Sequence, residues 1–270
     1  MNLTKIKTSV FQQTRFILVE TSHPGNIGAA ARAIKNMGFG QLVLLRPRFE
    51  DALSHPEAIA FASGAQDILQ QVYIVDTIDA ALQGVHFAAA VSARLREFSP
   101  PVLTARELAA HITQEAFIAA DQVAALIFGN ERYGLPNDVV EKCQALINIP
   151  ANPDYSSLNL AQAVQVLAYE CRLAALDVSY VSQATHATKI APMIGFQGKT
   201  ASVEQIEGMY AHLEQALIAI EFLDADNPKK LMPRLKRLFS RTQLEQEEVN
   251  ILRGIASQIL SARPRIRRGP

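Results

Sequence analysis

The chain has 270 residues, of which 49% are hydrophobic and 19% are charged, and its formal net charge is zero. This length suffices for one large domain, or for a main domain with an appendage. The opening MNLTKIKTSV lacks the apolar stretch of a signal peptide, and no segment is long enough to span a bilayer. We therefore expect a cytoplasmic protein rather than a secreted or membrane protein.

Cys143 and Cys171 are the only cysteines in the sequence. Two thiols are too few for a thiolate zinc site, and no nearby histidine has the spacing to complete one. We expect two buried, reduced thiols and no bound metal.

Short apolar runs alternate with helical patterns over the first 175 residues. The expected strands are 15–20, 41–46, 72–76, 86–92, 123–129 and 145–150. The expected helices are 27–37, 57–69, 77–83, 104–119, 136–144 and 158–177. Nearly continuous apolar strands separated by helices indicate an α/β fold, in which a parallel sheet has helices on both faces. We assign this domain to residues 1–178.

Residues 179–201 have no clear period and are rich in Ser, Thr, Ala and Gly, so they are the expected linker. Residues 202–270 then form a small helical C-terminal extension, with helices expected at 203–223, 228–240 and 243–261. Its helix starts are marked by capping boxes at Ser202 and Thr242 and by Asn227-Pro228, and a further capping box begins at Thr104.

The extension carries most of the excess positive charge. From Lys229 to Pro270 there are eleven Lys or Arg residues against three Glu. Clustered cations favour a polyanionic partner, because they displace counterions from a phosphate backbone. A solvated helix face followed by a basic tail would have the same composition, so both interpretations stay open.

The segment ETSHPGNIGAAARAIKNMGF, residues 20–39, follows the first strand and opens a helix. Gly25-Asn-Ile-Gly28 is similar to a degenerate dinucleotide-binding loop. However, the full glycine pattern is missing, and the second strand ends in Leu45-Arg46-Pro47-Arg48 without a ribose-binding acid. An NADP-binding oxidoreductase would tolerate those arginines, but no tyrosine is followed by a lysine four residues later. This function remains the weaker alternative.

Two polar residues of this segment are not needed for phosphate binding. Asn26 is expected in the turn, and Arg32 about one turn into the helix, so that both side chains project toward the same cleft. A buried cation needs an anionic partner. Arg32 therefore indicates a substrate phosphate or a developing oxyanion.

Two further polar motifs follow apolar strands. One is Phe128-Gly-Asn-Glu-Arg-Tyr-Gly-Leu-Pro136, and the other is Ile147-Asn-Ile-Pro-Ala-Asn-Pro-Asp-Tyr-Ser-Ser-Leu-Asn-Leu160. Folds with parallel sheets build their sites at such carboxyl ends. Ser156 or Ser157 could instead simply cap the next helix.

Together, N-x-G-x-x-x-R, G-N-E-x-x-G-L and I-P-x-x-x-x-x-S-L-N resemble the motifs of the SpoU branch of the SPOUT methyltransferases. The resemblance covers about residues 14–176. The first and third motifs are most similar to the tRNA (cytidine/uridine-2′-O)-methyltransferases of that branch, and Val249–Ile255 is similar to their C-terminal helix.

The resemblance implies a C-terminal trefoil knot at about residues 125–165, a rare exception to the rule against knots. It also implies S-adenosylmethionine as cofactor, a homodimer with the site completed across the interface, and the tRNA anticodon stem-loop as partner. The cofactor-binding residues carried over are Val91, Ser92, Ala93, Gly129, Ile149, Ser156, Ser157 and Leu158.

The implied reaction is attack of a ribose 2′-oxygen on a sulfonium methyl group, at cytidine or uridine 32 of the anticodon loop. Arg32 is expected at the reacting hydroxyl, with Asn26 and Glu131 fixing its geometry and Ser156 and Asn159 supporting the ribose or the cofactor. Arg32 could act as general base or stabilise the forming alkoxide, and we favour stabilisation because arginine is strongly basic.

The remaining alternative is a non-catalytic RNA-binding protein with the same knot. Such a protein could lose Arg32 or the cofactor loop, and neither is lost here. Candidate contacts to the RNA backbone are Arg94, Arg96 and the stretch 229–241.

Overall fold

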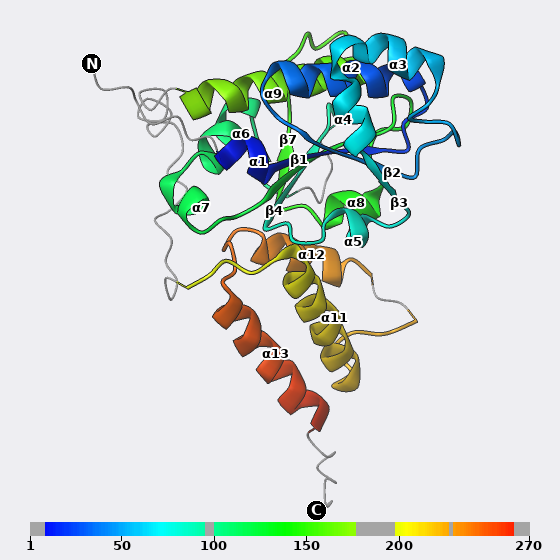
Figure 1. Ribbon diagram of the computed structural model, residues 1–270. Coiled ribbons are helices and arrows are strands. Elements are labelled where there is room, and N and C mark those ends of the chain that lie inside the picture. The colour runs from blue at the N-terminus through cyan, green and yellow to red at the C-terminus, as the bar shows by residue number, and fades with distance from the viewer. Residues whose placement is uncertain (1–8, 95–99, 177–197, 227–228, 262–270) are drawn as a thin grey trace, which may run out of the picture.

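The computed structural model of the protein describes residues 9–94, 100–176, 198–226 and 229–261 (Figure 1). Residues 179–197 of the expected linker lie outside the described residues, as do Arg96, Asn227 and Pro228. The end of the linker segment is described. Ala201 is buried there, and its backbone N–H donates to the Leu244 carbonyl at 2.9 Å.

Within the described residues, seven strands form one parallel sheet in the order β3-β2-β1-β6-β4-β7-β5. The strands are β1 (Thr14–Val19), β2 (Gln41–Leu45), β3 (Tyr73–Val75), β4 (Phe87–Val91), β5 (Val102–Leu103), β6 (Ala124–Phe128) and β7 (Ala145–Ile147). The six strands predicted from the apolar runs are confirmed. Strand β5 was not predicted, because two residues are too few to show a pattern.

Each face of the sheet has its own hydrophobic layer. On β1, Phe16 and Leu18 belong to one layer and Ile17 and Val19 to the other, and all four side chains are fully buried. Alternate side chains of a strand point to opposite faces. A strand that is buried on both faces is therefore apolar at every position, as predicted.

Helices cover both faces of the sheet, which confirms the α/β class (Figure 1). The layer of Phe16 includes α1 (Ser9–Gln13), α2 (Pro24–Asn36), α4 (Gln66–Gln71), α6 (Ala105–Ile112), α7 (Glu115–Ala119) and α9 (Leu160–Leu176), with α3 (Pro56–Ala62) packed on α2. The opposite layer includes α5 (Ile78–Ala81) and α8 (Asn137–Glu141).

Two predicted helices are divided. The helix expected over 57–69 is interrupted at Ser63, where φ is 51° and a 3-10 turn (Ser63–Ala65) separates α3 from α4. The helix expected over 104–119 stops before Thr113, whose hydroxyl donates to the Ala109 carbonyl at 2.8 Å. The capping boxes at Thr104 and Ser202 are both confirmed.

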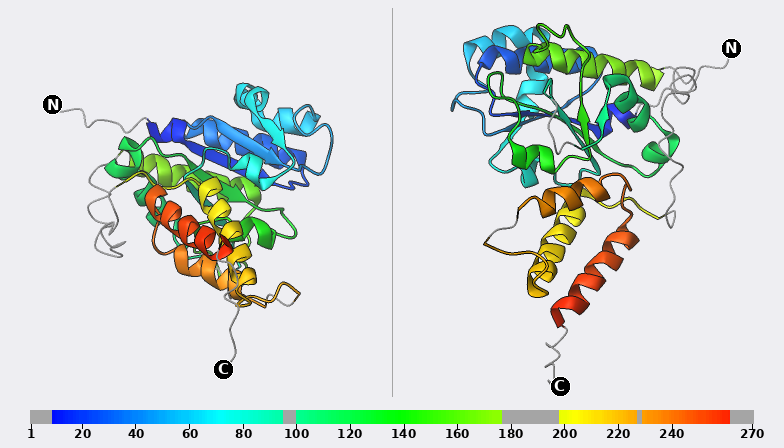
Figure 2. Two further views of the ribbon diagram at one scale, coloured as in Figure 1. Left: turned by 90° about the horizontal axis from the view of Figure 1, so that it is seen from below. Right: turned by 180° about the vertical axis from the view of Figure 1, so that it is seen from behind.

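The C-terminal extension contains α11 (Val203–Ala219), α12 (Leu231–Phe239) and α13 (Gln246–Ser261). It lies on the side of the sheet that carries α5 and α8, away from α2 and α9 (Figures 1 and 2). Two predicted starts are wrong. Helix α13 begins at Gln246 while the Thr242 hydroxyl donates to Phe239 O, and α12 begins at Leu231 because Lys229 has a φ of 49°.

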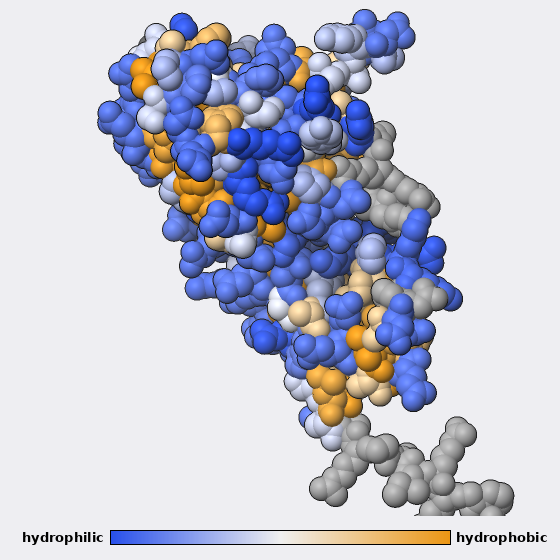
Figure 3. All heavy atoms as spheres, turned by 90° about the vertical axis from the view of Figure 1, so that its right-hand side faces the viewer, coloured by the Kyte–Doolittle hydropathy of each residue, from blue (hydrophilic) through white to orange (hydrophobic). Residues whose placement is uncertain are grey.

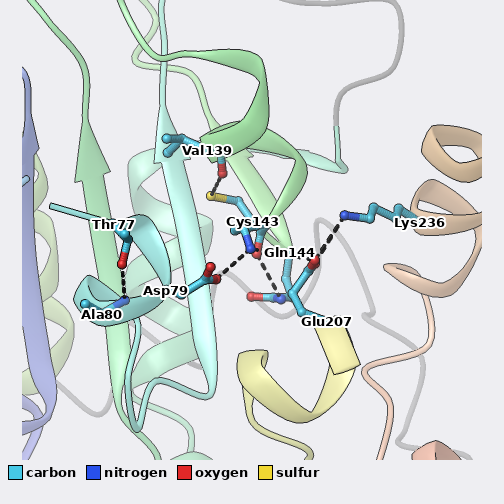
Figure 4. Close-up of polar contacts among 9 residues, drawn as sticks. Thr77, Asp79, Ala80, Val139, Cys143, Gln144, Glu207 and Lys236 are labelled. Atoms are coloured by element: carbon cyan, nitrogen blue, oxygen red, sulfur yellow. Dashed lines mark hydrogen bonds and ion pairs between the residues drawn. The ribbon is translucent and has the colours of Figure 1, made fainter. Parts of the chain in front are cut away.

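Charged side chains join the extension to the sheet domain (Figure 4). Lys142 Nζ lies 2.6 Å from Asp79 Oδ1 and 3.8 Å from Glu207 Oε2. Lys236 Nζ lies 3.1 Å from the same Glu207 oxygen. These residues follow or belong to α8, α5, α11 and α12, so one small ion cluster connects helices of both regions. We call it the Lys142–Glu207 cluster.

Both cysteines are free and buried, as expected. Burial raises the pKa of Cys171 to about 12, so this thiol is a poor nucleophile. No group of His, Cys, Asp and Glu side chains in the described part of the chain could hold a metal ion. None of the described helices combines the length and apolar character of a membrane span.

Candidate active site

The carboxylate of Glu131 lies at the centre of a hydrogen-bond network at the carboxyl ends of β1 and β6. Its Oε1 accepts from the Asn26 side-chain amide at 2.7 Å. Its Oε2 accepts from the Ser22 backbone N–H at 3.0 Å and from the Ser22 hydroxyl at 2.8 Å. Both oxygens are thus occupied, and the carboxylate is fixed.

The third motif joins the same network through Asn159. Its side-chain amide donates to Asn26 Oδ1 at 3.0 Å, and its own Oδ1 accepts from the Ala161 backbone N–H at 2.9 Å. Asn159 therefore connects the start of α9 to the start of α2. The structure brings together three of the expected site residues, Asn26, Glu131 and Asn159, from three separate motifs.

The electrostatic state of Glu131 follows from this network. Burial by itself would raise the pKa of this half-buried carboxyl, but the hydrogen bonds from Asn26 and Ser22 favour the charged form and lower its pKa below the ordinary value. Glu131 is therefore ionised at neutral pH. It serves as a fixed anion and acceptor, not as a proton donor.

A pocket of about 330 Å³ opens beside Glu131. It is lined by the loops after β4, β6 and β7 and by the start of α9. Such a volume is typical of sites for small molecules. Its lining includes all eight residues expected to bind the cofactor: Val91, Ser92, Ala93, Gly129, Ile149, Ser156, Ser157 and Leu158.

The loop after β6 needs glycine where its two arms meet. A Cβ at Gly129 would lie 2.3 Å from the Gly134 carbonyl carbon, and Gly134 itself has a φ of 73°. Asn130 closes the loop, since its backbone exchanges hydrogen bonds of 3.0 and 2.8 Å with Gly134. The two arms of this loop consequently meet through backbone groups at one side of the pocket.

Arg32 does not line this pocket. It lies on the exposed side of α2, and within the described residues it makes no hydrogen bond or ion pair. Asn26 belongs to the first turn of α2 rather than to the preceding turn, so the two side chains point in different directions around the helix. The pocket of a single chain therefore does not bring both side chains to one cleft, and their shared cleft stays a prediction for a site completed by a second copy.

Ser156 and Ser157 do not cap the next helix. Helix α9 begins at Leu160, and Asn159 binds its first backbone N–H groups, which leaves both hydroxyls exposed at the pocket. A helix-capping role is thereby excluded for these two serines. Both remain available to a ligand.

Sequence reasoning missed Ser22, Arg132, Tyr133 and Leu135. Ser22 makes two of the three side-chain and backbone contacts to Glu131, and the other three residues line the pocket. Position alone could have indicated Ser22, because it lies three residues beyond the carboxyl end of β1. Arg94, a candidate for RNA contact, also lines the pocket.

Gly28, in the segment 20–39, allows two helices to pack closely together. A Cβ at Gly28 would lie 2.0 Å from the Ala58 carbonyl oxygen, so Gly28 allows α2 to pack closely on α3. Close helix packing, and not nucleotide binding, therefore explains the glycine that made this segment similar to a dinucleotide-binding loop. It gives no support to an NADP-binding oxidoreductase.

Comparisons with known proteins find relatives of both regions of the chain. Residues 13–169 match the model of the SpoU rRNA Methylase family. The chain belongs to the SpoU methylase family. Residues 204–268 also match the model of the C-terminal domain of the tRNA methyltransferase TrmJ, so both regions of the chain have counterparts.

Curated relatives extend over nearly the whole chain. It is 43% identical over 249 residues to the tRNA (cytidine/uridine/adenosine-2′-O-)-methyltransferase TrmJ of Pseudomonas aeruginosa, covering 92% of this chain and 94% of that protein. It is also 43% identical over 251 residues to the tRNA (cytidine/uridine-2′-O-)-methyltransferase TrmJ of Escherichia coli K12, covering 93% and 96%.

Solved structures show the same fold. TrmJ from Z. mobilis ZM4 is 31% identical and superposes with a TM-score of 0.72, covering 92% of this chain and 99% of that one. A probable methyltransferase from Bordetella pertussis Tohama I is 48% identical with a TM-score of 0.59, covering 63% and 99%.

Proposed function

We propose that this protein transfers a methyl group from S-adenosylmethionine to the 2′-oxygen of a ribose in tRNA. The curated relatives carry names for this activity. The observation that carries the proposal is the single pocket lined by all eight expected cofactor residues, with Glu131 at its side.

The pocket residues fit S-adenosylmethionine. Apolar side chains such as Val91 and Ile149 suit an adenine ring, the exposed hydroxyls of Ser156 and Ser157 suit polar groups, and the Glu131 carboxylate suits a positive charge. When bound, S-adenosylmethionine supplies an activated methyl group. The protein then has to align the ribose and assist the loss of its proton.

We assign the chemistry of the 2′-hydroxyl to Arg32. A guanidinium stays protonated in ordinary surroundings, so it stabilises the forming alkoxide and a neighbouring phosphate through charge. Asn26 and Glu131 hold the ribose side of the site, and Ser156 and Asn159 support the ribose or the cofactor. The proposed target is cytidine or uridine 32 in the anticodon stem-loop.

A homodimer reconciles the position of Arg32 with this role. Arg32 is exposed and outside its own chain's pocket, so we assign it to the pocket of a second copy. Exposed apolar side chains on α3 and α9, such as Phe61 and Tyr169, lie on the same side of the sheet as α2 and support self-association there. We also propose a trefoil knot over residues 125–165. It is supported by one observation: the segment after β6 and the segment after β7 line the same pocket.

The first experiment incubates unmodified bulk tRNA with S-adenosylmethionine and quantifies 2′-O-methylcytidine and 2′-O-methyluridine by mass spectrometry. We expect product with the wild-type protein and a loss of at least about 100-fold for Arg32→Ala. Arg32→Lys serves as the control that keeps the charge. Absence of product with wild-type protein would refute the proposal.

Mixed dimers test the shared site. Ala93→Trp fills the pocket from an exposed position, and Arg32→Ala removes the guanidinium. Each variant alone should be inactive, whereas coexpressed variants should regain part of the activity, since one pocket would then be intact and served by the other chain's Arg32. A site made by one chain would give no recovery.

A further inference from the structure

A second polar surface lies next to the pocket, and the proposed chemistry does not use it. It consists of Glu20, Arg46, Arg48 and Tyr133, and we call it the arginine–tyrosine rim. Arg46 and Arg48 belong to the Leu45-Arg-Pro-Arg48 sequence that would have suited an NADP phosphate. Without a dinucleotide site in the first loop, these two arginines need another explanation.

The rim places two cations on one anion. Arg46 Nη2 lies 3.3 Å from Glu20 Oε1, and Arg48 Nη2 lies 2.9 Å from Glu20 Oε2. The arginine side chains remain 44% and 46% exposed, so their free N–H groups face solvent. One carboxylate neutralises only one of them, which leaves the rim with a net positive charge.

An aromatic ring completes this surface. Arg48 Cζ lies 5.4 Å from the centroid of the Tyr133 ring, and Tyr133 also lines the candidate cofactor pocket. The tyrosine is 62% exposed, so its ring contributes little to the core. The rim is therefore continuous with the site at which the methyl group would be transferred.

The backbone that presents the rim is strained and well fixed. Glu20 and Arg46 have φ values of 50° and 48°, a region that non-glycine residues seldom adopt. Hydrogen bonds hold both, since Glu20 N–H donates to Leu45 O at 2.8 Å and Arg46 N–H donates to Val75 O at 3.0 Å. Such strain persists where surrounding structure enforces it, often at functional sites.

The loop that carries Tyr133 is fixed by Asn130. The Asn130 side-chain oxygen accepts from the backbone N–H groups of Arg132 at 2.9 Å and Tyr133 at 3.1 Å. The Asn130 amide donates to the Glu20 carbonyl at 2.6 Å. One asparagine thus ties the aromatic loop to the residue between the two arginines, so that ring and guanidinium groups keep their relative positions.

We propose that the arginine–tyrosine rim binds a single-stranded stretch of the RNA substrate next to the methylated nucleotide. One base stacks on Tyr133, and the arginines contact the adjoining phosphates. Unpaired RNA bases stack on aromatic rings and guanidinium planes, and arginine suits phosphate geometry. This inference rests on the proposed function, because it assigns part of the same substrate.

The test measures binding of an unmodified anticodon stem-loop RNA by fluorescence anisotropy over a salt series. Tyr133→Ala should weaken binding about 5- to 100-fold with little change in salt slope, whereas Tyr133→Phe should bind like wild type. Arg48→Ala should weaken binding and reduce the salt slope by about one unit. Arg48→Lys should keep the slope.

Tyr73→Ala is the matched control, since Tyr73 is 44% exposed and lies at the start of edge strand β3. It should bind RNA like wild type. S-adenosylmethionine affinity is measured by calorimetry for every variant. If Tyr133→Ala weakens only cofactor binding, or if neither Tyr133→Ala nor Arg48→Ala weakens RNA binding, the rim does not bind RNA and the inference is overturned.

Methyl transfer by the wild-type protein separates this inference from the proposed function. Transfer with rim variants of unchanged RNA affinity refutes the rim and leaves the proposed function standing. Rim-dependent RNA binding without transfer refutes the proposed function and supports the rim. A wild-type protein that binds no RNA refutes both.

Discussion

The sheet domain and the C-terminal extension differ in how completely they bury their apolar residues. Helices α2 and α9 bury theirs against the sheet, and strand side chains such as Phe16 and Ile17 are fully enclosed. By contrast, α12 has no buried residue, and α11 and α13 leave large apolar side chains exposed. Figure 3 shows apolar groups at the far end of the extension.

This difference indicates that the sheet domain is the more rigid part of the molecule. The pocket loops start from strands that are held on both faces, so their hydrogen bonds are fixed before any ligand arrives. The extension has a small core around Met209 and Leu244, and it is joined to the sheet domain partly by the Lys142–Glu207 cluster. Changes in the sheet domain should consequently have larger effects than equivalent changes in the extension.

The largest effect is expected for Gly28→Ala. The added methyl group would lie 2.0 Å from Ala58 O and 2.8 Å from Ala62 N, so α2 and α3 must separate. We expect the free energy of unfolding to fall by about 3 kcal/mol, measured by urea denaturation. The control is Gly64→Ala, where a Cβ meets nothing within 4 Å. Equal stability of the two variants would contradict the tight packing described for this domain.

The buried His111 should make the sheet domain sensitive to acid. Burial between Phe87 and Phe117 lowers its pKa to about 4 from an ordinary value of 6.5. The unfolded chain therefore binds a proton that the folded chain does not, and stability is complete above about pH 6.5 and falls toward pH 4. The loss reaches roughly 3 kcal/mol.

His111→Leu should remove most of this pH dependence in thermal unfolding, whereas His23→Gln, at an exposed histidine, should keep it. If both variants lose stability with acid as wild type does, the acid response comes from another group. The assignment to the sheet-domain core would then be wrong.

Glu131→Gln tests the rigid polar network of the pocket. The amide cannot accept from both Ser22 groups and from Asn26 as the carboxylate does, so we expect kcat/KM for tRNA methylation to fall about 10- to 100-fold. The matched control is Glu207→Gln, the same substitution in the extension. Similar losses in both variants would remove the contrast between the two regions.

Glu207→Gln should itself have a small structural effect. It removes the charge that Lys236 and Lys142 share. These side chains are mostly buried, but Lys142 keeps its ion pair with Asp79, so we expect the free energy of unfolding to fall by about 1 to 2 kcal/mol. Hydrogen exchange of α11 should quicken slightly, while β1 stays unchanged. Glu214→Gln on the same helix is the control, and exchange that quickens throughout β1 would show that the extension stabilises the sheet.

The smallest effect, of opposite sign, is expected for Gly208→Ala in α11. A Cβ there meets no atom within 4 Å, and alanine favours a helix interior by about 0.5 to 1 kcal/mol over glycine. Thermal unfolding should shift slightly upward. A destabilised variant would mean that α11 packs as closely against another surface as α2 does on α3.

The sequence was informative wherever a local pattern carried the structure. Continuous apolar runs predicted six strands, because parallel strands are buried on both faces. Polar motifs at strand ends predicted the pocket, because those ends share one edge of the sheet. Capping boxes at Thr104 and Ser202 predicted helix starts, because the partners are only three residues apart.

Long-range geometry was not predictable in the same way. The order of strands depends on pairing between distant segments, and no local pattern indicates that β6 lies between β1 and β4. A positive φ ended a helix at Ser63 and delayed one at Lys229, and neither residue is itself a glycine, although Gly64 directly follows Ser63. The direction of Arg32 depends on where α2 sits on the sheet, which spacing alone does not give.

The central position of β6 in the sheet also affects how the chain folds while it is being synthesised. Thr14 pairs with Ala124, so one edge of β1 stays open until about 110 further residues have left the ribosome, roughly 5 to 20 seconds at ordinary synthesis rates. Open strand edges invite pairing with other chains. The pocket wall closes later still, at Ala163 in α9. A nascent chain shorter than this has its first strands and its Arg32 but no complete pocket, so premature termination releases fragments prone to aggregation rather than partly active enzyme.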